Sequence, residues 1–229
     1  MVREPLSQER IVDAAAAVAD RRGLHAVSMR TVAAELGVEA MSLYHHIANK
    51  NELLDALADW VFTRMEVPRG GQPWRAAMAE RAVAQRRVLA AHPWALGLTE
   101  SRRHAGPAVL RHHDAVLGLL FEAGFPVALA GHAFSLLDAY VFGFVLTEVN
   151  VPMEHGVSAD ELVAELPLAQ YPHLARFAAE RVVNQNYHYG EEFEVGLELV
   201  LDALDDRLAA ARHANARPSI PSPSPASGE

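Results

Sequence analysis

Residues 27–50, VSMRTVAAELGVEAMSLYHHIANK, are the stretch from which the fold of this chain is predicted. Ser28 can cap the start of a first short helix, and Gly37 can take the left-handed backbone conformation that ends it. A second helix is expected over 39–47, and a capping box that begins at Asn49 starts a third. Two short helices joined by a tight glycine turn are typical of a helix-turn-helix, whose second helix enters the DNA major groove.

The outward face of the second expected helix carries hydroxyl and imidazole groups and no carboxylate. Leu43 and Ile47 are four residues apart and are expected to point into the core. Lys50, the only lysine of the chain, follows at the start of the next helix. Side chains of these types suit a surface that approaches phosphates and base edges, although a generic three-helix surface is the alternative. The outward residues are Ala40, Met41, Ser42, Tyr44, His45 and His46.

The net charge of −9 is unevenly distributed along the chain. Residues 1–50 carry six basic and six acidic side chains, so the acidic excess belongs to the remainder. Ionic screening acts over about 8–10 Å, and local charge therefore decides whether a surface contacts phosphate. The acidic remainder disfavours non-specific coating of nucleic acid and favours one small DNA-binding surface.

Residues 36–58, LGVEAMSLYHHIANKNELLDALA, resemble the DNA-binding domain of the TetR family of one-component transcriptional repressors. Residues 193–204, FEVGLELVLDAL, resemble the last helix of the tetracycline-repressor subgroup. The resemblance implies an all-α fold, with an N-terminal three-helix helix-turn-helix domain followed by a helical ligand-binding and dimerisation domain. The family motif appears as Leu43-Tyr44-His45-His46, Lys50 and Leu53-Leu54.

The resemblance also implies which residues contact DNA, at the start of the first helix and along the second. Tyr44 and Lys50 would hold phosphates, while Arg30 would touch bases. Ala40 stands where the tetracycline repressor has glutamine, and Met41 where it has proline, so the operator sequence is expected to differ. The residues expected to bind DNA are Ser28, Arg30, Thr31, Ala40, Met41, Ser42, Tyr44, His45, His46 and Lys50.

The domain organisation follows from breaks in the helical pattern. We expect the DNA-binding domain over 1–50 and a helix over 49–66 that links it to the next domain. A helical ligand-binding and dimerisation domain is expected over 67–213, after a stretch rich in proline and glycine. Residues 214–229 form a proline- and serine-rich tail that is expected to be disordered.

Two long apolar helices, expected over 127–149 and 191–212, are more than one small domain needs for its own core. The resemblance implies that they form a four-helix bundle with the same helices of a second subunit. A twofold homodimer would also present two recognition helices to half-sites one turn of DNA apart. The alternative is a monomer in which both helices are interior.

Asp138 lies in the middle of the most apolar expected helix, where an unpaired carboxylate is costly. Ser135, Asp138 and Phe142 share one helical face. This face can supply a polar anchor in an apolar cavity for a small molecule. Alternatively, the carboxylate is hydrogen-bonded within the core to a His or Arg of a neighbouring helix. The residues expected to line the ligand cavity, each of which can also be plain core, are Trp74, Met78, Trp94, Phe134, Ser135, Asp138 and Phe142.

The sequence contains no recognisable catalytic or cofactor motif. The chain has no cysteine, which excludes disulfides, thiolate catalysis and thiolate metal sites. HExxH, a glycine-rich phosphate loop and the GxSxG elbow are all missing. We therefore expect no enzyme activity, no cofactor and no metal. The magnesium-dependent drug recognition of the tetracycline repressor has no convincing counterpart around 91–102.

The expected function is that of a DNA-binding regulator rather than a membrane or secreted protein. No apolar run approaches the roughly 18 residues of a membrane span, and the N-terminus lacks a secretion signal, so a cytoplasmic location is expected. The expected partners are a double-stranded DNA operator, a small and largely apolar effector that releases it, and a second copy of the chain. Alternatives are a helix-turn-helix regulator without ligand control, an activator, and a helical ligand carrier or enzyme.

Overall fold

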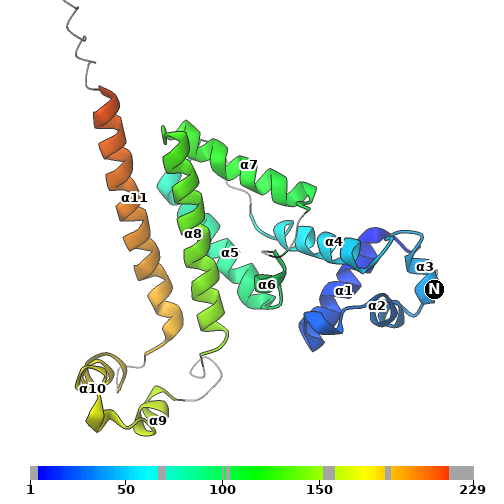
Figure 1. The fold of residues 1–229 in the computed structure, drawn as a ribbon, viewed down its shortest axis with the longest axis horizontal. Helices are drawn as coiled ribbons and strands as arrows, with labels where there is room; N and C mark the ends of the chain where they lie inside the picture. The colour runs from blue at the N-terminus through cyan, green and yellow to red at the C-terminus, as the bar shows by residue number, and fades with distance from the viewer. Residues whose placement is uncertain are drawn as a thin grey trace, which may run out of the picture.

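The computed structural model describes residues 5–66, 71–99, 101, 104–151, 158–183 and 187–216. Within these ranges all regular structure is helical and no strand is present. The helices form a small head, made of residues 5–49 with the first half of the linking helix, and a larger body made of the rest (Figure 1). The predicted all-α fold class is thereby confirmed. Residues 214–216 of the expected tail continue the last helix, and its other residues lie outside the described ranges.

The head is built from α1 (Gln8–Arg22), α2 (Met29–Leu36) and α3 (Ala40–Leu43), which pack around alanine, valine and leucine side chains. Ser28 caps the start of α2, and Gly37 ends it with a φ of 65°, as predicted. Glycine adopts this left-handed conformation at little cost because it has no Cβ. The tight turn that results joins α2 to α3.

The next helix, α4 (Lys50–Phe62), contributes side chains to two separate cores. Leu53 and Leu57 are fully buried in the core of the head. One turn further along, Val61 is fully buried in the core of the body. A helix anchored in this way on both sides couples the position of the head to that of the body.

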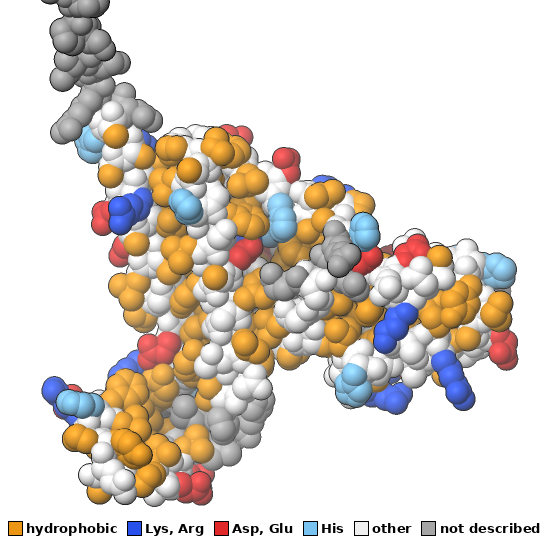
Figure 2. Space-filling model, viewed as in Figure 1, with side chains coloured by type: hydrophobic (Ala, Val, Ile, Leu, Met, Phe, Trp, Pro, Cys, Tyr) orange, Lys and Arg blue, Asp and Glu red, His pale blue; other side chains and the backbone are white. Residues whose placement is uncertain are grey.

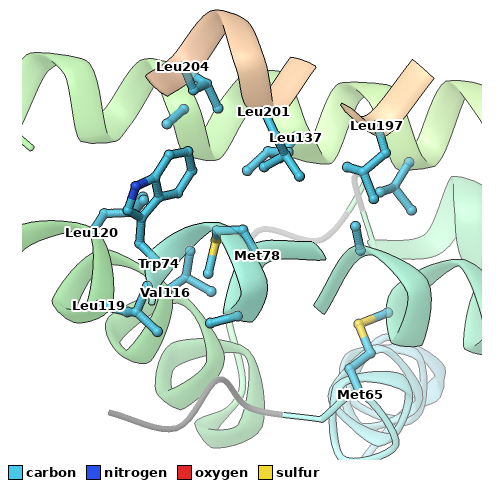
Figure 3. Close-up of a cluster of buried hydrophobic side chains, with 14 of the residues drawn as sticks. Met65, Trp74, Met78, Val116, Leu119, Leu120, Leu137, Leu197, Leu201 and Leu204 are labelled. Carbon is cyan, nitrogen blue, oxygen red and sulfur yellow. The ribbon is translucent and has the colours of Figure 1, made fainter. Parts of the chain in front are cut away.

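The body consists mainly of α5 (Trp74–Ala91), α7 (Pro107–Glu122) and α8 (Val127–Glu148), with α11 (Glu192–Ala216) lying along α8. The short α6 (Ala95–Thr99) packs against α4. Figure 3 shows the core that forms where these helices meet. Its labelled side chains are Met65, Trp74, Met78, Val116, Leu119, Leu120, Leu137, Leu197, Leu201 and Leu204.

The segment between α8 and α11 forms an arm of short helical pieces at one end of the body (Figure 1). It contains α9 (Ala159–Ala164) and α10 (Pro172–Phe177), and α10 runs into a π-helical turn at Ala178–Val182. The arm leaves several large apolar side chains between 45% and 54% exposed, namely Leu166, Tyr171, Leu174 and Phe177.

By length and composition alone, α8 could cross a membrane, which corrects the expectation that no segment could do so. The helix has 22 residues, and Asp138 and Glu148 are its only charged side chains. Its inner face, which includes Leu137 and Val141, is buried against α5, α7 and α11. A core helix that packs against three neighbours has the same apolar composition as a membrane span.

The opposite face of α8 is apolar and exposed, together with the neighbouring face of α11. Leu136 and Leu146 of α8 are 45% and 57% exposed, and Val195 and Leu199 of α11 are 58% and 66% exposed. Figure 2 shows hydrophobic side chains gathered over these two helices. Several large apolar side chains exposed on neighbouring helices are typical of a protein–protein interface.

Candidate DNA-binding surface and ligand cavity

The predicted recognition helix is shorter than expected. The regular helix α3 has only four residues, Ala40–Leu43, instead of spanning 39–47. Its N-cap makes no side-chain hydrogen bond, and a single turn of helix gains little from its own main-chain bonds. A hydrogen-bonded turn continues the chain, in which the N–H of Ile47 donates to the carbonyl of Leu43 at 2.9 Å. Leu43 and Ile47 are fully buried, as predicted, so they hold this turn against the head.

The other side chains of α3 and the following turn lie largely at the surface. Met41 is 72% exposed and Tyr44 is 45% exposed. His45 and His46 are exposed, while the smaller Ala40 and Ser42 are partly buried. The structure therefore places most of these predicted contact residues at the surface of the head.

Arg30 and Lys50 extend this surface with positive charge. Both are exposed, and neither has an ion-pair partner among the residues that the structure describes. Arg30 lies in the first turn of α2, and Lys50 is the first residue of α4. Unpaired cations at a surface are free to bind phosphate oxygens. The DNA-binding surface proposed below consists of these two residues with the exposed side chains of 40–46.

The hydroxyls of Ser28 and Thr31 are used to start α2. Oγ of Ser28 accepts a hydrogen bond from the N–H of Thr31 at 3.1 Å, and Oγ1 of Thr31 accepts one from the N–H of Ser28 at 2.9 Å. Oγ1 of Thr31 also lies 2.8 Å from the carbonyl oxygen of Ala26, to which it can donate. The capping role of Ser28 was predicted, but both residues were also expected to bind DNA, and the reciprocal capping, in which threonine replaces the usual glutamate, was not predicted.

The body contains a cavity of about 410 Å³, within the size range of small-molecule sites. Four of the predicted ligand residues line it together: Phe134, Ser135, Asp138 and Phe142. The walls supplied by α4, α6, α7 and the loop before α7 were not predicted from the sequence. Those residues are Ala58, Phe62, Thr99, His104, Ala105, Val109 and His113.

Asp138 is both a hydrogen-bonded core carboxylate and a polar group of the cavity, the two interpretations that the sequence left open. Its Oδ1 accepts a hydrogen bond from Nη2 of Arg81 at 2.5 Å and a longer one from Nε2 of Gln85 at 3.4 Å. The side chain of Arg81 is 1% exposed, whereas that of Asp138 is 24% exposed and lines the cavity. The carboxylate is thus a core ion-pair partner and a polar group of the cavity wall at once. Its charge is balanced from behind by the guanidinium.

A layer of buried polar side chains lies behind the cavity wall. Within the described part of the chain, both ring nitrogens of His112, Oε1 of Gln85, and Nε and Nη1 of Arg81 make no hydrogen bond. Burial, the charge of Arg81 and the neighbouring His113 together lower the pKa of His112 to about 3. His112 is therefore neutral near pH 7. Its ring packs edge-on against Phe62, at 5.4 Å between ring centroids.

The remaining three ligand candidates lie elsewhere. Trp74 packs edge-on against Phe125 at 4.9 Å, and Met78 is fully buried, so both belong to the core (Figure 3). Trp94 lies at the junction of head and body, where its Nε1 donates to Oδ1 of Asp20 at 2.6 Å. The expectation that these three line the same cavity as Asp138 is therefore wrong. Their size and apolarity are needed for packing between helices.

A larger hollow of about 760 Å³ lies between α1, α4 and the loop before α7. It is more open to solvent than the cavity in the body, and acidic side chains dominate its polar lining. Trp60 crosses it and donates from Nε1 to Oδ1 of Asp13 at 2.6 Å. We interpret it as the interface between head and body rather than as a ligand site, because its walls come from both units and a hydrogen bond joins them across it.

A helical head with an exposed recognition turn, joined by one shared helix to a body with an internal cavity, defines a helix-turn-helix regulator with a separate sensory domain. The chain belongs to the TetR family. Residues 11–57 match the family model described as "Bacterial regulatory proteins, tetR family". Residues 67–208 match the model described as "Tetracyclin repressor-like, C-terminal domain". The chain is accordingly a DNA-binding transcriptional regulator.

Similar proteins span nearly the whole chain. The repressor DrrR1 of Streptomyces coeruleorubidus is 32% identical over 220 residues, which cover 90% of this chain and 80% of DrrR1. The class A tetracycline repressor from Escherichia coli is 28% identical and covers 91% of this chain and 94% of its own length. Among solved structures, apo ActR from Streptomyces coelicolor superposes with a TM-score of 0.74, is 33% identical, and covers 92% of this chain and 99% of ActR.

Proposed function

We propose that this chain is a repressor that binds a double-stranded DNA operator as a homodimer and releases it when a small aromatic molecule enters the cavity of the body. The observation that carries the proposal is the position of α4. Its Leu53 and Leu57 lie in the core of the head, while its Ala58 and Phe62 line the cavity. Occupation of the cavity and orientation of the head are therefore linked through one rigid element.

On the DNA side, the exposed surface of the head supports the proposal. We propose that Tyr44 and Lys50 bind phosphates and that Arg30, Met41 and Ser42 reach base edges. Residues 1–50 are formally neutral in sequence, so the specific contacts of a few side chains, rather than a broad basic patch, must provide affinity.

The homodimer is supported by the apolar face that α8 and α11 share. Leu136, Leu146, Val195 and Leu199 are too exposed for the core of a monomer. Pairing this face with its copy across a twofold axis would bury all four and place the two heads on the same side of the bundle. Two heads then read two half-sites of the operator.

The lining of the cavity supports an aromatic effector. Phe62, Phe134 and Phe142 offer ring faces and edges, and Asp138 offers a hydrogen-bond acceptor whose charge Arg81 balances. ActR has been crystallised with actinorhodin bound, and this protein is 32% identical in sequence to the ActR of that complex. We infer an effector of comparable aromatic character, with its own pattern of polar groups.

Release of DNA then follows from differential binding. If the effector binds the conformer with separated heads more tightly than the DNA-bound conformer, DNA affinity falls by the same factor. Coupling of this kind is typically about 1–3 kcal/mol, or roughly 5–150-fold in affinity. The family and the relatives are transcriptional regulators, and we propose no catalytic role, cofactor or membrane attachment. We place the protein in the cytoplasm with its DNA.

The test is to select bound fragments from random DNA with the purified protein, and then to measure binding to the selected sequence with a panel of aromatic compounds. We expect a twofold-symmetric sequence, bound by a dimer. At least one compound that raises the melting temperature should weaken binding at least about fivefold. Sequence-independent binding by a monomer would refute the proposal. Specific binding that every stabilising compound leaves unchanged would favour a regulator without ligand control.

A further inference from the structure

The start of α7 is capped by a carboxylate from a different helix. Gly106, the residue before α7, has no side chain to cap it, and Pro107 at its first position has no N–H. The next two amides, those of Ala108 and Val109, both donate to Oδ1 of Asp59, at 2.7 and 3.0 Å. Asp59 lies on α4. The helix that links head and body is therefore hydrogen-bonded to the first turn of α7.

The close approach of the two helices depends on glycine at position 106. A Cβ there would lie 2.3 Å from Oδ1 of Asp59 and 2.4 Å from its Cγ, which no non-bonded contact tolerates. The negative charge of Asp59 also faces the positive end of the α7 dipole, which strengthens the interaction. Local sequence, charge and backbone geometry all favour the same contact.

The ligand cavity opens between the same two helices. Ala58 and Phe62 of α4 line it on one side, and Val109 and His113 of α7 on the other. Asp59 does not line this cavity and faces the hollow between head and body instead. Val109 both lines the cavity and donates to Asp59, so a molecule that fills the cavity acts on the α4–α7 pair within one helical turn of the Asp59 hydrogen bonds.

We infer that Asp59 is the positioning residue that transmits ligand binding from α7 to the DNA-binding head, an inference that rests on the proposed function. With Asp59 in place, displacement of α7 by a bound molecule moves α4, and Leu53 and Leu57 carry the movement into the core of the head. Without the carboxylate, α7 can shift while α4 stays, and occupation of the cavity no longer changes DNA affinity.

A covalent surrogate for the effector provides the test. Because the chain has no cysteine, the thiol of a Ser135→Cys variant is unique, and residue 135 lines the cavity and is exposed. A bimane group attached there fills the cavity. DNA affinity is measured by fluorescence anisotropy, before and after labelling, on a fragment selected from random DNA. The measurement is repeated with Asp59 intact, with Asp59→Ala and with Asp59→Asn.

With Asp59 intact, labelling should weaken DNA affinity roughly tenfold, or about 1.4 kcal/mol. In Asp59→Ala, the labelled and unlabelled proteins should bind DNA within about twofold of each other. Asp59→Asn should keep most of the tenfold effect, because the amide oxygen still accepts both hydrogen bonds. Glu66→Ala is the matched control, since it removes a 77% exposed carboxylate just beyond α4, and it should keep the full effect. A covalent label excludes weaker ligand binding as the cause.

Equal loss of affinity on labelling in the Asp59 and Asp59→Ala backgrounds would overturn the role of Asp59 and leave the ligand response standing. No loss in either background would refute the link between cavity and DNA, and the inference with it. If Asp59→Ala does not melt cooperatively, Gly106→Ala decides the question, because its methyl group displaces the carboxylate from α7. An undiminished tenfold effect in Gly106→Ala would also overturn the inference.

Discussion

Asp138 and Arg81 form a charge pair at the boundary between cavity and core. Removing Asp138 should lower the unfolding free energy by more than removing Arg81. The side chain of Arg81 is 1% exposed and that of Asp138 is 24% exposed. In Asp138→Ala the guanidinium stays buried without its counter-ion. In Arg81→Met the remaining carboxylate still reaches the cavity, where it can be solvated.

The expected magnitudes follow from this asymmetry. Removing one partner of a fully buried ion pair costs about 3–5 kcal/mol of unfolding free energy. Since Asp138 is partly exposed, we expect a loss of roughly 2–4 kcal/mol for Asp138→Ala and about 1–2 kcal/mol for Arg81→Met. For a chain of this size, the larger loss corresponds to a fall in melting temperature of roughly 5–15 °C.

Urea unfolding followed by far-ultraviolet circular dichroism measures these losses directly, with thermal melting alongside. The double variant Arg81→Met with Asp138→Leu should recover most of the stability, because two apolar side chains replace the pair without leaving a charge behind. Glu180→Ala is the control. It breaks an ion pair with Arg176 whose members are 63% and 76% exposed, and it should change stability by no more than about 0.5 kcal/mol.

A larger loss from Arg81→Met than from Asp138→Ala would refute the reasoning, since the buried cation would then not be the costly partner. Equal losses would indicate that Asp138 is solvated no better than Arg81. A double variant less stable than both single variants would show that the attraction within the pair exceeds the desolvation cost of burying its two charges, so that the pair contributes net stability to the body.

Other parts of the molecule give further predictions. Lys50→Ala should weaken binding to every DNA sequence and reduce the salt slope of log K by about 1, whereas Arg30→Ala should also relax base preference when selection from random DNA is repeated. Leu146→Glu combined with Leu199→Glu should convert the dimer to a monomer in light scattering and abolish operator binding at nanomolar protein. The pKa of His112 is lowered to about 3, so between about pH 6.5 and pH 3 the unfolded chain binds a proton that the folded chain does not. The unfolding free energy should therefore fall as pH falls through this window, and urea titrations of His112→Leu should show a weaker pH dependence.

Local chemistry accounts for the parts of the head that the sequence predicted correctly. Ser28, Gly37 and Asn49 act on the main chain within a few residues of themselves, and the structure keeps all three capping roles. The capping box expected at Asn49 differs in one bond. Glu52, its second member, accepts from the N–H of Ala48 rather than from that of Asn49. The length of α3 was not predictable in the same way, since a four-residue helix without a side-chain cap depends on the packing of Leu43 and Ile47 against the head.

The cavity could be predicted only in part, because its walls come from distant segments. Phe134, Ser135, Asp138 and Phe142 share one face of one helix, so periodicity alone identified them. Phe62 and His113 belong to other helices, and only the packing of α4 and α7 against α8 adds them to the site. Composition likewise could not separate Trp94, which serves the junction of head and body, from an aromatic wall residue.

Because α4 contributes side chains to the cores of both head and body, it limits how proteins with this architecture can acquire new operator specificity. A head transplanted alone would lose Leu53 and Leu57 from beneath its recognition turn, while a head transplanted with α4 would bring Val61 into a body shaped for a different helix. Recombination of whole domains would therefore disrupt packing at one junction or the other. Stepwise replacement of exposed side chains such as Met41 leaves both cores untouched, so new DNA targets are more readily reached by point substitution than by domain exchange.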